Sequence, residues 1–154
     1  MQIRSARESD AVALREIVER AYSVYIERIG RRPAPMNDDY AKKIREGCIS
    51  VADEDSEIVG LIVLLVKQDH LLIENVAVDP EHQGRGVGRA LMAHAETYAS
   101  QQHISELRLY TNVAMTENLT LYSRLGYRED DRRVENGLRR VFFSKRLKST
   151  PSMS

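Results

Sequence analysis

Apolar side chains recur every three or four residues in several stretches of the chain, a spacing typical of helices with one buried face. The first such stretch begins after Ser9-Asp10, a pair that can cap a helix, and continues to Ile29, where Gly30 ends it. The same spacing predicts three further helices, at residues 40–46, 89–102 and 116–124.

Shorter segments between the helices contain apolar residues that either alternate with polar ones or follow one another without a break, as in β-strands. Residues 58–67 are almost all apolar, which predicts a strand covered on both faces. Asn136-Gly137 favours positive φ at both central positions of a turn, so the last two strands are expected to form a hairpin. The remaining pattern predicts strands at residues 2–4, 48–52, 70–78, 106–111, 127–134 and 138–147.

These elements follow in the order β-α-α-β-β-β-α-β-α-β-β, which predicts an α/β (α+β) domain on a largely antiparallel sheet. One strand–helix–strand crossover surrounds the glycine-rich stretch Gln83-Gly84-Arg85-Gly86-Val87-Gly88. Glycines let a backbone turn tightly and approach a ligand closely, and the helix that follows offers unpaired N–H groups and the positive end of its dipole. This combination predicts an anion site, most often for phosphate.

Spacing excludes two common phosphate loops. A dinucleotide loop needs Gly-x-Gly-x-x-Gly, but the sixth positions counted from Gly84 and Gly86 are Arg89 and Leu91. A Walker loop ends in Gly-Lys-Ser/Thr, whereas Gly88 is followed by Arg89-Ala90. A tight turn that binds no ligand is the remaining alternative to an anion site of another kind.

Length and charge narrow the class of protein. The 154 residues predict one domain, 1–148, followed by a flexible tail, 149–154. Lys plus Arg and Asp plus Glu both number 23, so the charge balance does not point to nucleic acid or an acidic membrane as the main partner. A single cysteine excludes an internal disulfide framework, and the longest apolar run, 60–66, is too short to span a bilayer. We therefore expect a cytoplasmic protein.

Two segments resemble the GNAT superfamily of acetyl-CoA-dependent N-acetyltransferases. The first is 76–91, which contains the glycine loop, and the second is 107–127, which ends in Leu121-Tyr122 followed by Gly126-Tyr127. The resemblance implies the GNAT fold, with six or seven mostly antiparallel strands flanked by about four helices. It also implies an acyltransferase that uses acetyl-CoA as co-substrate and needs no metal.

The resemblance assigns residues to the cofactor. In the family, the pantetheine arm lies along the edge of the strand that precedes the glycine loop, and the loop holds the pyrophosphate. Asn118 matches an asparagine that contacts the arm in a subset of the family, whereas other members place it three residues earlier, where this chain has Met115. The residues expected to bind the cofactor are Val76, Ala77, Val78, Gln83, Gly84, Arg85, Gly86, Val87, Gly88, Arg89, Asn112 and Asn118.

Two residues are candidates for catalysis. Tyr122 aligns with the family tyrosine that faces the thiol and is proposed as general acid; the alternative is an ordinary core tyrosine. Glu74 is two residues before Val76, so strand alternation would place both on one face, where a carboxylate could accept the proton of the ammonium. The alternative for Glu74 is a solvated or salt-bridged side chain on an open part of the sheet.

The acceptor is expected to be the primary amine of a small molecule or peptide. In the family, the first two helices, their loop and the last hairpin usually shape the acceptor site. Here these segments offer Tyr22, Tyr25, Arg31, Arg32, Tyr40 and Arg139. Two other functions stay open, namely an acyl-CoA-binding regulatory domain without catalysis and a transferase that uses another acyl donor. A homodimer through the last strands is also compatible with the pattern.

Overall fold

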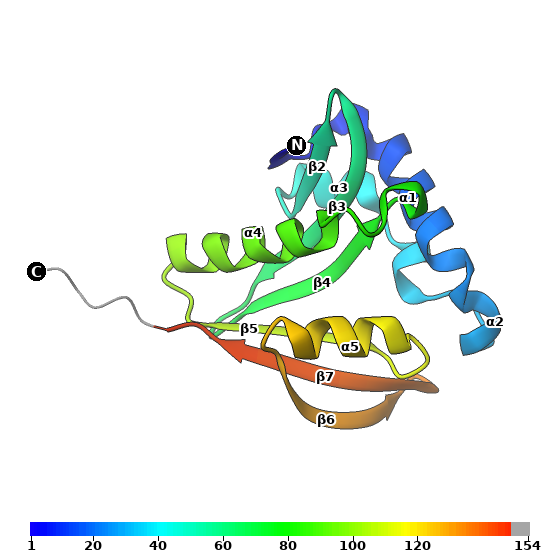
Figure 1. Ribbon diagram of the computed structural model, residues 1–154, viewed down its shortest axis with the longest axis vertical. Helices are drawn as coiled ribbons and strands as arrows, with labels where there is room; N and C mark the ends of the chain where they lie inside the picture. Colours follow the sequence, from blue (N-terminus) through cyan, green and yellow to red (C-terminus); the bar gives the residue numbers. More distant parts are fainter. Residues whose placement is uncertain (149–154) are drawn as a thin grey trace, which may run out of the picture.

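A computed structural model of the protein, described over residues 1–148, contains one seven-stranded sheet in the order β1-β2-β3-β4-β5-β7-β6 (Figure 1). The pairing of β4 with β5 is parallel and the other pairings are antiparallel. The predicted flexible tail, 149–154, lies outside the described residues. The strands are β1 Gln2–Ser5, β2 Ile49–Glu54, β3 Glu57–Val66, β4 Leu71–Val78, β5 Glu106–Asn112, β6 Arg128–Glu135 and β7 Leu138–Arg146.

The helices correct one prediction. The expected single helix from Asp10 to Ile29 is divided at Val24 into two α-helices. Val24 keeps right-handed helical dihedrals (φ −64°, ψ −21°), so the apolar stripe stays in phase and its periodicity could not reveal the break. The α-helices are α1 Ala11–Ser23, α2 Tyr25–Ile29, α3 Tyr40–Arg45, α4 Val87–Gln101 and α5 Thr116–Arg124, and the 3-10 helices are η1 Glu8–Asp10, η2 Ala34–Asn37 and η3 Pro80–His82.

The sheet divides the core into two layers. On one face, α4 and α5 pack against the sheet through residues such as Leu91 and Tyr122. On the other face, α1 and α3 bury Leu14 and Tyr40. The central part of β3, Val59–Leu64, is buried, which confirms the prediction of a strand covered on both faces. None of the helices in the described part of the chain is both long and apolar enough to cross a membrane.

The strands β4 and β5 diverge, and this divergence positions the site. Only Leu71–Ile73 of β4 pair with β5, opposite Leu107–Leu109. Beyond these pairs the two strands separate, as Figure 1 shows below and to the right of the β4 label. The edge of β4 from Glu74 to Val78 therefore has no strand partner on the β5 side. Backbone groups on that side are available to a ligand, apart from the Val76 carbonyl, which accepts from the Tyr22 hydroxyl at 3.3 Å.

A β-bulge in β4 changes which way Glu74 faces. Val63 of β3 lies opposite Asn75, and Leu64 lies opposite Ile73, so Glu74 has no counterpart. Such an extra residue interrupts the alternation of side chains. Val76 packs with the α4 layer, whereas Glu74 contacts Lys43 of α3 on the opposite face. The expectation that Glu74 and Val76 share a face was therefore wrong, because strict alternation does not allow for a bulge.

Candidate functional site

A groove of about 610 Å³ runs between the free edge of β4, the glycine loop and α5. The side of the groove formed by β4 and the loop contains most of the residues that the sequence assigned to a cofactor. These are Val76, Ala77, Val78, Gln83, Gly84, Gly86, Val87, Gly88 and Arg89. The opposite side contains Asn118 and Tyr122 from α5, so one continuous surface brings together two segments that are about thirty residues apart.

The glycine loop has the backbone that an anion site requires. Gly84 and Gly86 have positive φ values of 82° and 83°, which side chains disfavour, and a Cβ atom at either position would meet open space. Gly86 is the N-cap of α4, so the first N–H groups of the helix have no intrahelical partner. Asp79 anchors the start of the loop, because its buried carboxylate accepts hydrogen bonds from the Glu81 N–H (3.1 Å) and from Arg20 of α1 (2.7 Å).

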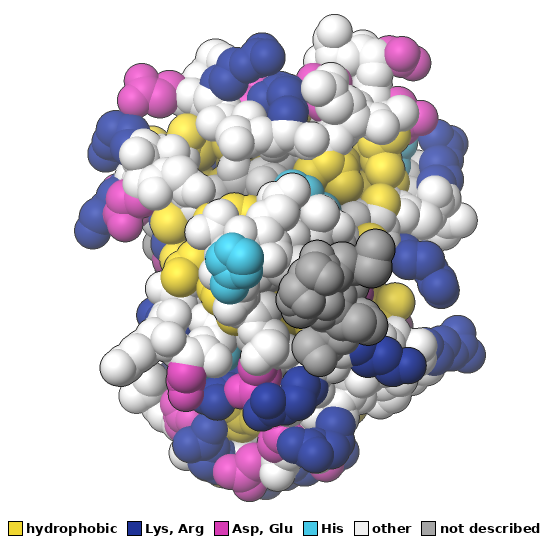
Figure 2. All heavy atoms as spheres, turned by 90° about the vertical axis from the view of Figure 1, so that its left-hand side faces the viewer, with side chains coloured by type: hydrophobic (Ala, Val, Ile, Leu, Met, Phe, Trp, Pro, Cys, Tyr) yellow, Lys and Arg dark blue, Asp and Glu magenta, His cyan; other side chains and the backbone are white. Residues whose placement is uncertain are grey.

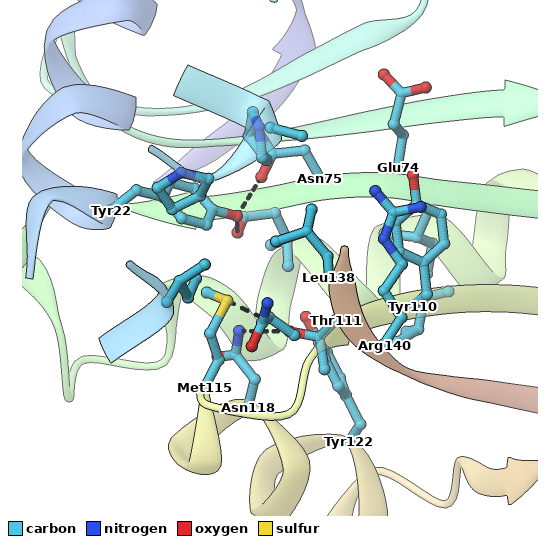
Figure 3. Close-up of a pocket in the computed structure, with 18 of the residues that line it drawn as sticks. Tyr22, Glu74, Asn75, Tyr110, Thr111, Met115, Asn118, Tyr122, Leu138 and Arg140 are labelled. Atoms are coloured by element: carbon cyan, nitrogen blue, oxygen red, sulfur yellow. Dashed lines mark hydrogen bonds between the residues drawn. The ribbon is translucent and has the colours of Figure 1, made fainter. Parts of the chain in front are cut away.

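A second, smaller cavity of about 210 Å³ opens between β4 and β5 toward α2 and η2 (Figure 3). It shares five lining residues with the groove, and these mark the point where the two spaces meet. The shared residues are Tyr22, Val76, Met115, Asn118 and Tyr122. A ligand that lies in the groove and a second ligand that fills the cavity can therefore approach each other beside Tyr122.

Aromatic neighbours hold Tyr122 on the α5 side of this junction. Its ring packs against Phe143 and Tyr127, with centroid distances of 5.7 and 6.2 Å. Burial raises the pKa of the Tyr122 phenol, so the hydroxyl keeps its proton at neutral pH. Among the described residues no group accepts a hydrogen bond from it, which leaves this proton available to a ligand.

Three polar side chains fix the α1 side of the cavity. The Tyr22 hydroxyl donates to the side-chain carbonyl of Asn75, and the Asn75 amide donates to the Tyr40 hydroxyl at 3.0 Å. Tyr40 in turn donates to the Pro35 carbonyl at 2.6 Å. Tyr22 and Asn75 are buried, and burial raises the pKa of Tyr22, so this chain of neutral hydrogen bonds is stable against changes of pH near neutrality.

Glu74 borders the cavity but is already paired. Its carboxylate contacts the Lys43 ammonium, which also binds Asp38 at 2.9 Å. Figure 3 shows the Glu74 carboxylate pointing away from Tyr122. The salt-bridged alternative raised for this residue therefore describes its ground state, and the catalytic role requires a bridging water rather than direct contact with an amine beside Tyr122.

The other residues that the sequence assigned are divided between the two spaces and their surroundings. Asn112 lines the cavity and not the groove, and its side-chain oxygen Oδ1 accepts from the Ala114 N–H at 2.9 Å, as in a strand-ending turn. Arg85 is exposed and borders neither space. Tyr25 lines the groove and donates to Glu117 at 3.2 Å.

The Arg31-Arg32 pair lies outside the cavity lining. Arg31 donates to the Asn136 carbonyl in the turn between β6 and β7. Arg32 forms an exposed ion pair with Glu19 at 2.9 Å. Both side chains therefore have partners within the protein, and the direct acceptor contact that we considered for them is not part of the observed geometry.

Several cavity residues were not among those named from the sequence, although two of them lie in the last hairpin. They include Asp38, Tyr110, Thr111, Leu138 and Arg140. The alternation in β7 could have indicated Arg140, because Leu138 and Arg140 alternate with the core residues Val141 and Phe143. No local pattern, however, indicates that this face of β7 lies beside the gap between β4 and β5.

Comparison with known proteins agrees with this geometry. Residues 11–127 match the model of the Acetyltransferase (GNAT) family. N-acetyltransferase family 8 member 3 of Rattus norvegicus is 32% identical over 88 residues, which make up 53% of this chain and 39% of the relative. The chain spans about half or less of the length of the curated relatives it matches.

Two solved structures have the same fold. The ribosomal-protein-S18-alanine N-acetyltransferase of Escherichia coli superposes with a TM-score of 0.77 over 99% of this chain and 97% of its own, at 18% identity. The PaiA N-acetyltransferase of Thermoplasma acidophilum, in complex with coenzyme A, gives 0.75 over 95% and 98%, at 19% identity. Together with the family model, which covers most of the sequence, these matches establish that the chain belongs to the Acetyltransferase (GNAT) family.

Proposed function

We propose that the protein is an N-acetyltransferase that transfers the acetyl group of acetyl-CoA to a primary amine by direct attack. One observation carries this proposal. The groove that contains the glycine loop and the smaller cavity are two separate spaces that meet beside the protonated hydroxyl of Tyr122. A two-substrate reaction needs this arrangement, because the reacting atoms must be held a few ångströms apart.

The residues of the groove fit coenzyme A. Open space over Gly84 and Gly86, together with the free N–H groups at the start of α4, suits a pyrophosphate. The unpaired edge of β4 at Val76–Val78 suits an extended arm with amide groups, which would add to the sheet as a further strand. Coenzyme A is the ligand in the Thermoplasma PaiA complex, and the proposal extends it to this chain.

The proposed chemistry gives separate tasks to Tyr122, Val76 and Glu74. Acetyl-CoA supplies the activated acetyl group as a thioester. Tyr122 donates its proton to the departing thiolate, and an N–H at Val76 donates to the carbonyl oxygen as negative charge develops there. Glu74 receives the proton of the ammonium through water, because its carboxylate points away from the junction.

Calorimetric titration tests the cofactor directly, with acetyl-CoA, desulfo-CoA and NADH as separate titrants. We expect both CoA compounds to bind and NADH not to bind, because the loop lacks the dinucleotide spacing. Release of free thiol with a panel of amines then tests catalysis. Failure of a folded protein to bind either CoA compound would contradict the proposal, whereas binding without turnover on any amine would favour a regulatory acyl-CoA-binding domain.

A further inference from the structure

Within residues 1–148, three charged residues line the cavity, and they differ in how they are paired. Asp38 and Glu74 both contact Lys43, so the two carboxylates at the α3 side already share a counter-charge. The third charged residue in the lining is Arg140 of β7. Figure 3 shows Arg140 beside Tyr110 on one side of the cavity, with Tyr22 and Asn75 on the opposite side.

Arg140 is largely buried and weakly paired. Only 14% of its side chain is exposed, and its guanidinium lies over the Tyr110 ring at 4.6 Å. Its ion-pair partner within the described residues is Glu135, at 3.4 Å, which is longer than the 2.7–2.9 Å of a strong charge-assisted bond. The planar fork of Arg140 carries five N–H donors, of which Nη1 donates to Glu135, and the other donors are available to a carboxylate in the cavity.

The loop after α2 contacts the turn between β6 and β7, and the cavity is small. Arg31, which follows α2, donates to the Asn136 carbonyl in the β6–β7 turn. Gly137 lies against the same guanidinium, because a Cβ at Gly137 would be 3.6 Å from it. The volume of about 210 Å³ is below the range of about 300–1,000 Å³ typical of drug-sized ligands. A small molecule fits this space, whereas several residues of a polypeptide would exceed its volume.

Part of the remaining lining is apolar and includes Ile29, Pro33 and Leu138. We propose that the acceptor is a free amino acid with an apolar side chain, whose carboxylate binds Arg140 while its amine reaches the junction beside Tyr122. This inference rests on the proposed acetyltransferase function and defines its acceptor class. It gives Arg140 the role of a substrate-binding residue that selects a carboxylate.

Paired substrates test the role of the carboxylate. Free amino acids with apolar side chains are compared with their amides, for example leucine with leucinamide, and with 3-methylbutylamine and a peptide that begins with alanine. Thiol release is measured with acetyl-CoA, and binding is measured by calorimetry on protein saturated with desulfo-CoA. We expect kcat/KM for at least one amino acid to exceed that of its amide by about 100-fold, since a site built for a charged group rejects an analogue without it.

The variant Arg140→Gln tests whether this arginine binds the carboxylate, and Arg139→Gln is its control. Arg139, which the sequence had offered for the acceptor site, is the neighbouring residue, is exposed and does not line the cavity. We expect Arg140→Gln to lower kcat/KM for the amino acid about 100-fold, to leave the amide nearly unchanged and to keep the affinity for CoA. Arg139→Gln should behave like the unmodified protein, which excludes a general effect of removing positive charge from β7.

The outcomes separate this inference from the proposed function. Equal or better turnover of the amide, the simple amine or the peptide would overturn the amino-acid acceptor but leave the acetyltransferase intact. If CoA binds but no amine is acetylated, the calorimetric measurement decides. Failure of every apolar amino acid to bind the desulfo-CoA complex would also overturn the inference. Loss of CoA binding itself would instead contradict the proposed function.

Discussion

The surroundings of Tyr122 in the fold determine the chemical properties of its hydroxyl. Its ring packs against Phe143 and Tyr127, while its hydroxyl reaches the junction of the groove and the cavity. Burial raises the pKa of the phenol, so it is a proton donor and not a base at neutral pH. A core position and a catalytic role are thus compatible for this residue.

Replacing Tyr122 by Phe should lower kcat about 100-fold, because general acid catalysis contributes roughly that much or more. The affinity for acetyl-CoA should stay within a few-fold, since the ring and its packing remain. Kinetics with chemistry as the slow step and calorimetry measure the two effects. Tyr127→Phe is the control, because that hydroxyl is buried, lines neither space and has no partner among the described residues. Unchanged turnover in Tyr122→Phe would remove this residue as the acid.

Among the elements, the segments that precede α4 and α1 have different tasks. The segment before α4 shapes the groove through the left-handed backbone of Gly84 and Gly86. The segment before α1 joins that helix to the sheet, because Asp10 accepts hydrogen bonds from the Arg7 N–H (2.7 Å) and from Arg4 of β1 (2.9 Å). Arg4 also binds Asp53 of β2 at 3.0 Å, so one cluster connects three elements.

Gly86→Glu should weaken the binding of acetyl-CoA at least about 100-fold, because it places a negative charge and a side chain at the proposed pyrophosphate site. Positive φ alone would strain any substitution there, so Gly47→Glu serves as control. Gly47 also has positive φ and open space around it but lies outside both spaces. Both variants should lose similar stability, and only the first should lose affinity for CoA. Unimpaired binding by folded Gly86→Glu would contradict the loop assignment.

Asp10 should make the free energy of unfolding depend on pH in the acid range. Burial alone would raise its pKa, but the hydrogen bonds from Arg4 and Arg7 outweigh burial and lower the pKa below the ordinary value of 3.8. The folded state thus holds this proton less tightly than the unfolded state, so the contribution is present above pH 3.8 and is lost as the pH falls further.

Asp10→Asn should cost about 2 kcal/mol at pH 7 and progressively less below pH 4. Urea unfolding as a function of pH measures this difference. Asp55→Asn is a suitable control, because Asp55 lies in the exposed turn between β2 and β3. An equal cost at pH 7 and pH 3 would show that the carboxylate of Asp10 is not the group that titrates.

The whole molecule consists of two hydrophobic layers that share one sheet. Leu14 in the α1 layer and Leu91 in the α4 layer are both fully buried, and β3 is covered on both sides. At the edge of the sheet, β6 carries paired charges, such as Arg132 with Glu129 at 2.9 Å. The lower part of Figure 2, where β6 lies, shows such basic and acidic side chains intermixed. Charges along an edge strand disfavour edge-to-edge pairing, whereas the homodimer through the last strands stays a prediction.

Because the layers share the sheet, residues 1–148 should unfold in a single transition, as one domain does. Leu14→Ala and Leu91→Ala should each cost about 3 kcal/mol. In both variants, far-ultraviolet circular dichroism and near-ultraviolet tyrosine signals should shift together in urea. Two separate transitions, one sensitive to Leu14 and the other to Leu91, would contradict the single-domain prediction.

Features that depend on neighbours in the sequence were predictable from it. The element order, the Asn136-Gly137 turn and the glycine loop followed from periodicity and spacing, and both turn residues have the expected positive φ, 52° and 76°. The two family segments then indicated the groove and Tyr122 together. Such features are local, because backbone conformation and helical phase depend on residues a few positions apart.

The lining of the smaller cavity depended on the tertiary structure. The bulge that turns Glu74 toward Lys43 arises from the pairing of β4 with β3, and no residue in β4 alone specifies it. Arg140 borders the cavity only because β5 leaves β4 after three paired residues and β7 follows β5. The sequence therefore determined the fold family and the glycine loop, whereas long-range strand pairing decided which side chains surround the smaller cavity.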